Sequence, residues 1–175
     1  MKEVSINKNM HLSEHFQLGE VTKTSVKTAD GRSATQGDAL LAKNIPSHVA
    51  IENLRNLCEN WLEELRENYN LIYEGVGDCK GDEPIIITSG YRSPEVNKAV
   101  GGAPTSNHLT GCAVDIRCAG IEQAIRYACI LLDIADGTKR DYDELFIERS
   151  KQGRYWIHFA VRPKENRRKT AFVQT

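Results

Sequence analysis

Hydrophobic residues recur at spacings of three to five over residues 47–69, which predicts an amphipathic helix with one apolar face. Two further helices are expected, one beginning at Ser93-Pro94-Glu95 and the other covering residues 121–133. At the first of these, serine can cap the helix and proline suits its first turn. The first 45 residues are polar and irregular, and within them Ser13 is expected to cap a short helix.

Short runs rich in β-branched and alternating residues predict four strands, at residues 84–89, 111–118, 144–149 and 154–161. Lys151-Gln152-Gly153 is expected to be the turn of a hairpin between the last two. Because helices and strands are partly segregated along the chain, we expect an α+β fold with a mainly antiparallel sheet and flanking helices.

The length of 175 residues favours a single domain, 1–175, that buries its own core. We expect this core over about residues 12–161, followed by a basic, solvated tail over residues 162–175. The five cysteines form no CxxC pair and are expected to be free thiols.

Composition excludes some classes of function. A formal charge of −1 gives no general attraction to nucleic acid, and no stretch approaches the roughly 20 apolar residues of a membrane span. The N-terminus lacks the apolar core of a secretory signal, so we expect cytoplasmic synthesis, with release to the cell wall by a separate mechanism if the protein acts there. We expect a monomer.

Three polar residues occupy positions where a core strand or its approach should be apolar: His108, Asp115 and His158. Asp115 is flanked by aliphatic residues, and burying a carboxylate there is costly unless it is paired or bound to a metal. Two histidines and one carboxylate are a common ligand set of catalytic zinc. Each residue alone is also compatible with a structural role, as a satisfied core histidine or an edge-strand aspartate.

Specific motifs in the sequence add a resemblance to a known family. Ser89-Gly90-Tyr91-Arg92-Ser93, followed by a Ser-x-His-x-x-Gly-x-Ala-x-Asp element that runs from Ser106 to Asp115, resembles the zinc D-alanyl-D-alanine carboxypeptidase family, most closely its phage and bacterial branch. Trp156-Ile157-His158 is similar to the family's third-ligand motif. The resemblance implies a hedgehog/DD-peptidase-like fold and runs from about residue 12 to residue 161.

The same resemblance implies roles for individual residues. It makes His108, Asp115 and His158 the ligands of Zn²⁺, Arg92 a group that binds the substrate carbonyl or the oxyanion, and Ser106 a substrate-binding residue or a cap of its turn. The expected substrate is a peptidoglycan stem peptide or another peptide ending in D-Ala-D-Ala. Two alternatives stay open: an endolysin-type endopeptidase that cuts L-Ala-D-Glu, and a zinc-stabilised binding domain without hydrolytic activity.

The general base is the position at which the resemblance fails. Several branches of the family carry an acid three residues before the last histidine, where this chain has Tyr155, a poor base at neutral pH. Glu148 is the next candidate. If Ser150 pairs with Arg154 in the hairpin, Glu148 shares a face with His158 at a diagonal offset of roughly 7–8 Å, whereas a register slip of one residue turns it away. Asp143 and Glu144 are further candidates for the general base.

Overall fold

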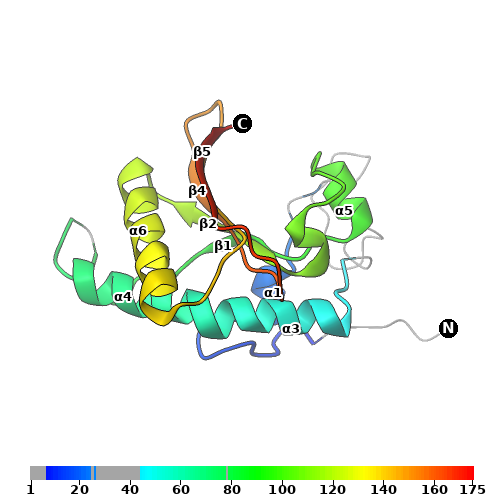
Figure 1. The fold of residues 1–175 in the computed structure, drawn as a ribbon, viewed down its shortest axis with the longest axis horizontal. Coiled ribbons are helices and arrows are strands. Elements are labelled where there is room, and N and C mark those ends of the chain that lie inside the picture. Colours follow the sequence, from blue (N-terminus) through cyan, green and yellow to red (C-terminus); the bar gives the residue numbers. More distant parts are fainter. Residues whose placement is uncertain (1–6, 25, 27–43, 78) are drawn as a thin grey trace.

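A five-stranded sheet forms the centre of the structure, a computed structural model that describes residues 7–24, 26, 44–77 and 79–175 (Figure 1). The strand order is β1-β2-β4-β3-β5. All neighbouring strands are antiparallel except β3 and β5, which run parallel. The strands are β1 (Ile87–Ser89), β2 (Ala113–Cys118), β3 (Glu144–Arg149), β4 (Tyr155–Ala160) and β5 (Lys169–Gln174). The expected α+β fold with a mainly antiparallel sheet and flanking helices is confirmed.

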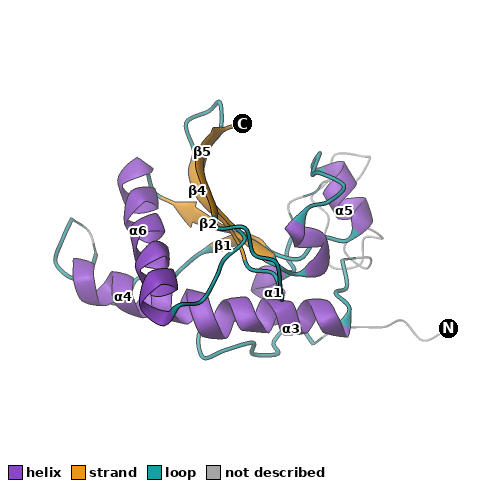
Figure 2. Cartoon of the chain, in the orientation of Figure 1, coloured by secondary structure: helices purple, strands orange, loops and turns teal. Residues whose placement is uncertain are grey.

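Helices surround this sheet on three sides, with α3 and α4 forming one long rod below it and α6 and α5 on opposite sides (Figure 2). The helix predicted over residues 47–69 extends to Tyr73 and contains a π-helical turn in its middle. Ser47 and Ser93 cap α3 and α5 through their side-chain oxygens, as their positions in the sequence indicate. The helical elements are α1 (Leu18–Val21), α3 (His48–Leu57), the π-helical turn η1 (Cys58–Leu62), α4 (Glu63–Tyr73), α5 (Pro94–Ala99), the 3₁₀ turn η2 (Asn107–Thr110) and α6 (Ile121–Thr138).

The two faces of the sheet differ in chemistry, because successive side chains of a strand point to opposite faces. One face is apolar and packs into the main hydrophobic core, where the Phe159 ring lies 5.0 Å from that of Trp61. Its other fully buried members include Val114, Ile116, Leu145 and Ile157. Asp115 and His158 lie on the opposite face, as direct cross-strand partners. These two polar residues therefore lie on the face of the sheet toward α5, away from the core.

Of the two hairpin registers that the sequence left open, the structure has the one that pairs Ser150 with Arg154. Ser150 N donates to Arg154 O, Phe146 stands opposite His158, and Glu148 stands opposite Trp156. Glu148 therefore lies on the same face as His158, two residues along the partner strand.

Two sequence-based expectations need correction. The segment 162–175 is largely exposed, as expected, but it is more than a tail, because Lys169–Gln174 forms edge strand β5 along β3. Its pairing is parallel and non-local, and Lys169–Gln174 lacks the regular alternation of apolar and polar residues that would predict a strand. Ser13 caps no helix; its hydroxyl donates to Glu63 of α4, and the short helix α1 begins only at Leu18, after Gln17. Among the described residues, no helix is long and apolar enough to cross a membrane.

Candidate metal centre

Three side chains that are distant in sequence converge on the polar face of the sheet. His108, Asp115 and His158 each offer one ligand atom, and these atoms lie within 4.8 Å of one another. Asp115 Oδ1 is 3.3 Å from His108 Nε2 and 3.0 Å from His158 Nδ1. Within the part of the chain that the structure describes, no other group of three such residues was found. The residues singled out in the sequence are thus brought together around one oxygen atom.

Local structure fixes His108 on the turn η2. The Ser106 hydroxyl accepts a hydrogen bond from the His108 backbone N–H and caps this turn. Gly111 ends it with a φ of 72°, a conformation that favours glycine. A Cβ at Gly111 would lie 2.4 Å from the carbonyl oxygen of Ala50, so a side chain here would push η2 away from α3. The glycine of the motif therefore lets His108 approach the sheet.

The outer ring nitrogens of both histidines have hydrogen-bond acceptors. His108 Nδ1 lies 2.6 Å from the carbonyl oxygen of Gly90, and His158 Nε2 lies 3.4 Å from a Glu144 carboxylate oxygen. Since a carbonyl and a carboxylate can only accept, these nitrogens carry the hydrogens. The other nitrogen of each ring then faces Asp115. Hydrogen bonds of this kind orient metal-binding histidines and set their tautomers.

Arg92 contacts the second oxygen of the aspartate. Its Nη2 donates to Asp115 Oδ2 at 2.5 Å, and its Nε donates to the Ser89 hydroxyl at 2.8 Å. Burial by itself raises the pKa of Asp115, but the charges and hydrogen bonds of His108 and His158 outweigh burial and hold that pKa well below its usual range. Asp115 is therefore an anion at neutral pH, ready to act as a ligand.

The donor set fits a divalent metal ion. Two imidazole nitrogens and one carboxylate oxygen face one another. Because all three can act as acceptors, they lie this close favourably only with a proton or a cation between them. Burial lowers the pKa of His158, but its hydrogen bonds with Asp115 and Glu144 raise that pKa to about 9. The site thus attracts positive charge, and its two imidazoles and one carboxylate match the chemistry of a catalytic zinc site with a fourth position open.

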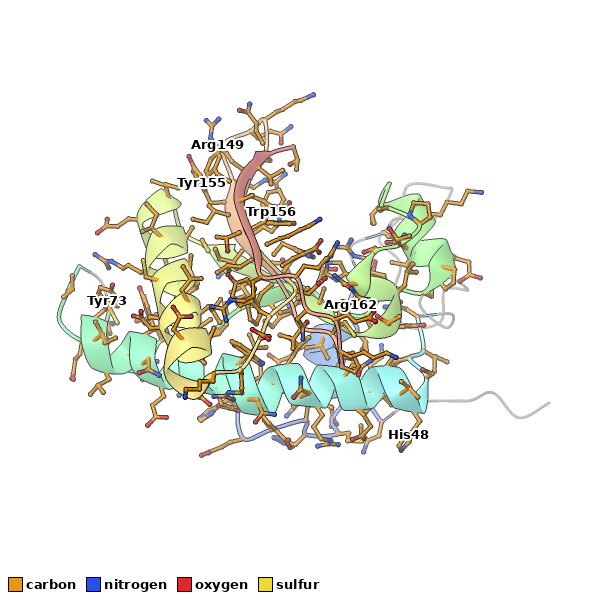
Figure 3. All side chains as sticks on the ribbon, in the orientation of Figure 1. His48, Tyr73, Arg149, Tyr155, Trp156 and Arg162 are labelled. Atoms are coloured by element: carbon orange, nitrogen blue, oxygen red, sulfur yellow. The ribbon has the colours of Figure 1, made fainter. Side chains whose placement is uncertain are left out.

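A cavity of about 480 Å³ opens above these three residues. Glu148 and Trp156 line it from the hairpin, and Arg92 and Ser106 line it from the loops on the other side. Figure 3 shows Trp156 on the side of β4 toward α5, whereas Tyr155 lies toward α6. The remaining lining residues are Thr88, Val100, Gly101, Gly102, Ala103, His108, Asp115, His158 and Thr175. All six residues expected to form the site therefore border one cavity.

The carboxylate of Glu148 is partly removed from water. Burial raises its pKa, and the negative charge of Asp115 acts in the same direction. The charges of His158 and Arg92 and a hydrogen bond from the side chain of Trp156 lower the pKa, but burial outweighs them. A carboxylate with a raised pKa is a stronger base than an exposed one.

The other candidate acids have different surroundings. Asp143 is fully buried and holds the guanidinium of Arg167 through two hydrogen bonds, and it does not line the cavity. Glu144 contacts Nε2 of His158, the ring nitrogen that does not face Asp115. Tyr155 belongs to the opposite face of β4, where Arg149 lies over its ring. Because odd and even positions of a strand face opposite ways, residue 155 cannot share the face of His158.

Several neighbours of the site gave no signal in the sequence. Gly90 contacts His108 through its backbone oxygen, which any residue type would provide. The position nevertheless requires glycine, because a Cβ there would lie 2.3 Å from the Val21 carbonyl oxygen. Thr175 reaches the cavity only because β5 joins the sheet. Asn107, next to His108, could have been found as a polar residue inside the recognised motif; its amide donates to Asp143 and Glu144.

Comparison with known families gives one match. The family model described as Peptidase M15 matches residues 14–133, which is more than half of the chain. The matched segment contains His108 and Asp115 and ends before β3, so Glu148 and His158 lie outside it. No curated protein matches the chain.

Proposed function

This chain belongs to the peptidase M15 family, and from this premise we propose that it is a zinc peptidase that hydrolyses peptidoglycan-type peptides, acting as a D-Ala-D-Ala carboxypeptidase. The family implies a metallopeptidase. The observation that carries the proposal is the convergence of His108, Asp115 and His158 at the floor of a cavity that Glu148 also borders.

In this proposal His108 Nε2, Asp115 Oδ1 and His158 Nδ1 hold the metal. These are the atoms that face one another, while the outer nitrogens of both rings are bonded elsewhere. When bound, a zinc ion polarises a carbonyl oxygen and makes water nucleophilic near neutral pH.

Glu148 is proposed as the general base. Its carboxylate borders the cavity, and burial raises its pKa toward neutrality, which favours proton transfer. It takes the proton from the attacking water as the new C–O bond forms. It then returns that proton to the leaving amine as the amide C–N bond breaks. Asp143 binds Arg167, and Glu144 contacts His158. Of the three candidate bases, Glu148 is the one that borders the cavity.

Arg92 and Ser106 are proposed to bind the substrate. A guanidinium has five N–H donors, and the contacts of Arg92 with Asp115 and Ser89 use only two of its nitrogens. The remaining donors are suited to the substrate carbonyl oxygen, where negative charge develops during attack. Ser106 borders the cavity in addition to capping η2.

Metal analysis and peptide hydrolysis test the proposal together. The purified full chain should bind about one zinc ion, and His108→Ala should lose it. With zinc bound, the chain should release D-alanine from a peptide ending in D-Ala-D-Ala. Glu148→Gln should retain zinc and lose about 10²- to 10⁴-fold in kcat.

Each failure has its own meaning. A chain without zinc affinity contradicts the metal site. Cleavage of an L-Ala-D-Glu peptide alone identifies the endopeptidase alternative, and no hydrolysis of either peptide or of purified sacculi identifies a zinc-stabilised binding domain. Unchanged turnover in Glu148→Gln removes Glu148 as the base and returns the role to Asp143 or Glu144.

A further inference from the structure

A network of charged side chains connects the C-terminal segment with the back of the metal site. Its members are Asp143, Glu144, Arg167 and Asn107. Arg167 lies in the loop between β4 and β5, a part of the chain beyond the residues that match the family model. None of the four borders the cavity, so the proposed reaction gives them no direct role.

Arg167 binds both acids at once. Its Nε is 2.7 Å from Asp143 Oδ1, and its Nη2 is 2.6 Å from Asp143 Oδ2 and 2.7 Å from Glu144 Oε1. Asp143 is fully buried, and its paired contact with the planar guanidinium fixes where Arg167 lies. The Arg167 backbone N–H also donates to Asp143. Asp143 therefore anchors the arginine, and the arginine holds Glu144.

Glu144 has two oxygens with separate partners. Oε1 accepts from Arg167, whereas Oε2 accepts from the Asn107 amide at 3.0 Å and lies 3.4 Å from His158 Nε2. The carboxylate therefore faces the imidazole in a fixed orientation. In the neutral ring, a hydrogen on His158 Nε2 means that Nδ1, which faces Asp115, carries a lone pair that can bind a metal ion.

We propose that Arg167 is a positioning residue of the metal site: by holding Glu144 against His158 Nε2, it keeps the ring in the orientation and tautomer that present Nδ1 to the metal. The inference rests on the proposed function, because it needs His158 as a ligand. It makes the C-terminal segment, through Arg167, a part of the site.

Zinc affinity, measured by competition with a chromophoric chelator on the full chain, tests this inference. Loss of a partner behind a metal-binding histidine weakens affinity by about 10- to 100-fold, and this is the loss expected for Arg167→Gln and for Glu144→Gln. Arg168→Gln is the matched control. Arg168 is the next residue, carries the same charge and pairs with Asp136 and Asp141, away from the metal site. It should bind zinc as tightly as the wild type.

A double-mutant cycle separates positioning from loss of structure. Since Arg167 acts through Glu144, Arg167→Gln should cause little further loss of zinc affinity in a Glu144→Gln background. In the metal-free protein, ¹⁵N NMR should show His158 with its hydrogen on Nε2 or on both nitrogens, and a shift toward the Nδ1-H form in Arg167→Gln. Should Arg167→Gln fail to fold, Glu144→Gln tests the same link, because it leaves the Asp143–Arg167 pair intact.

The possible failures are distinguishable. A wild-type chain that binds no zinc overturns the proposed function and this inference with it. If the wild type binds zinc and the zinc affinity of Arg167→Gln equals that of the wild type or of Arg168→Gln, only the inference is overturned. A loss of the same size in both backgrounds also overturns it, because Arg167 would then act independently of Glu144.

Discussion

Asp115 and His158 stand directly opposite each other on β2 and β4, with Asp115 Oδ1 3.0 Å from His158 Nδ1. Antiparallel pairing brings together two residues that are 43 positions apart in the chain. The sheet thus holds two of the three proposed ligands on rigid backbone, and only His108 comes from a turn.

Zinc should stabilise the fold through these ligands. At a free concentration about 100 times its Kd, a ligand of the native state adds about 2.7 kcal/mol, which for a chain of this size raises Tm by about 5–10 °C. Thermal unfolding of His158→Ala with and without zinc should show most of this shift lost. His48→Ala removes an exposed imidazole at the start of α3 and should keep it. An equal shift in His158→Ala would mean that zinc stabilises through another site.

Trp156→Phe should alter the pH dependence of hydrolysis. A hydrogen bond from Trp156 lowers the pKa of Glu148, so its removal lets that pKa rise further. Because a general base acts in its deprotonated form, the acidic limb of the kcat/KM profile should move to higher pH. Tyr155→Phe loses a hydroxyl on the opposite face of β4 and should leave the profile unchanged. A shift in both variants, or in neither, would contradict the contact between Trp156 and the base.

Glu63 should contribute to stability in a pH-dependent way. Burial raises its pKa, but hydrogen bonds from the His15 backbone and from the side chains of Ser13 and His15 outweigh burial and lower it. A lowered pKa stabilises the fold above the ordinary carboxyl range, and the contribution is lost as pH falls through the pKa of the folded state.

Glu63→Gln should therefore lower Tm at pH 7, and the difference from wild type should shrink below about pH 4. Thermal unfolding as a function of pH measures both. Glu67→Gln, an exposed position on the same helix, should lack this pH-dependent difference. A Glu63→Gln difference that stays constant down to pH 3 would show that charge has no part in it.

Gly111→Ala should affect both the fold and the site. Its positive φ alone costs about 1–2 kcal/mol for a residue with a Cβ, and the contact with the Ala50 carbonyl oxygen adds to this. Gly75→Ala is the matched control, with a φ of 75° and no atom within 4 Å of the added carbon. Urea unfolding should show a larger loss for Gly111→Ala, together with weaker zinc binding because His108 moves with η2. Equal losses in the two variants would contradict this account.

Much of the fold follows from local patterns. The amphipathic stripe that includes Leu54, Trp61 and Leu65 predicts the long helix, and the Gly153 turn predicts the hairpin, whose register the sequence left open. The π-helical turn at Cys58–Leu62 was not predicted, since a single widened turn leaves the hydrophobic period nearly unchanged.

The sequence by itself singled out the residues proposed to carry the chemistry, because polar residues such as Asp115 and His158 interrupt apolar strands and the motif around His108 is specific. Only the tertiary structure decided how they are supported. The pairing of β5 with β3 and the hold of Arg167 on Asp143 and Glu144 join segments over 20 residues apart. Such contacts depend on register and on the closing of long loops, and neither has a local signature in the chain.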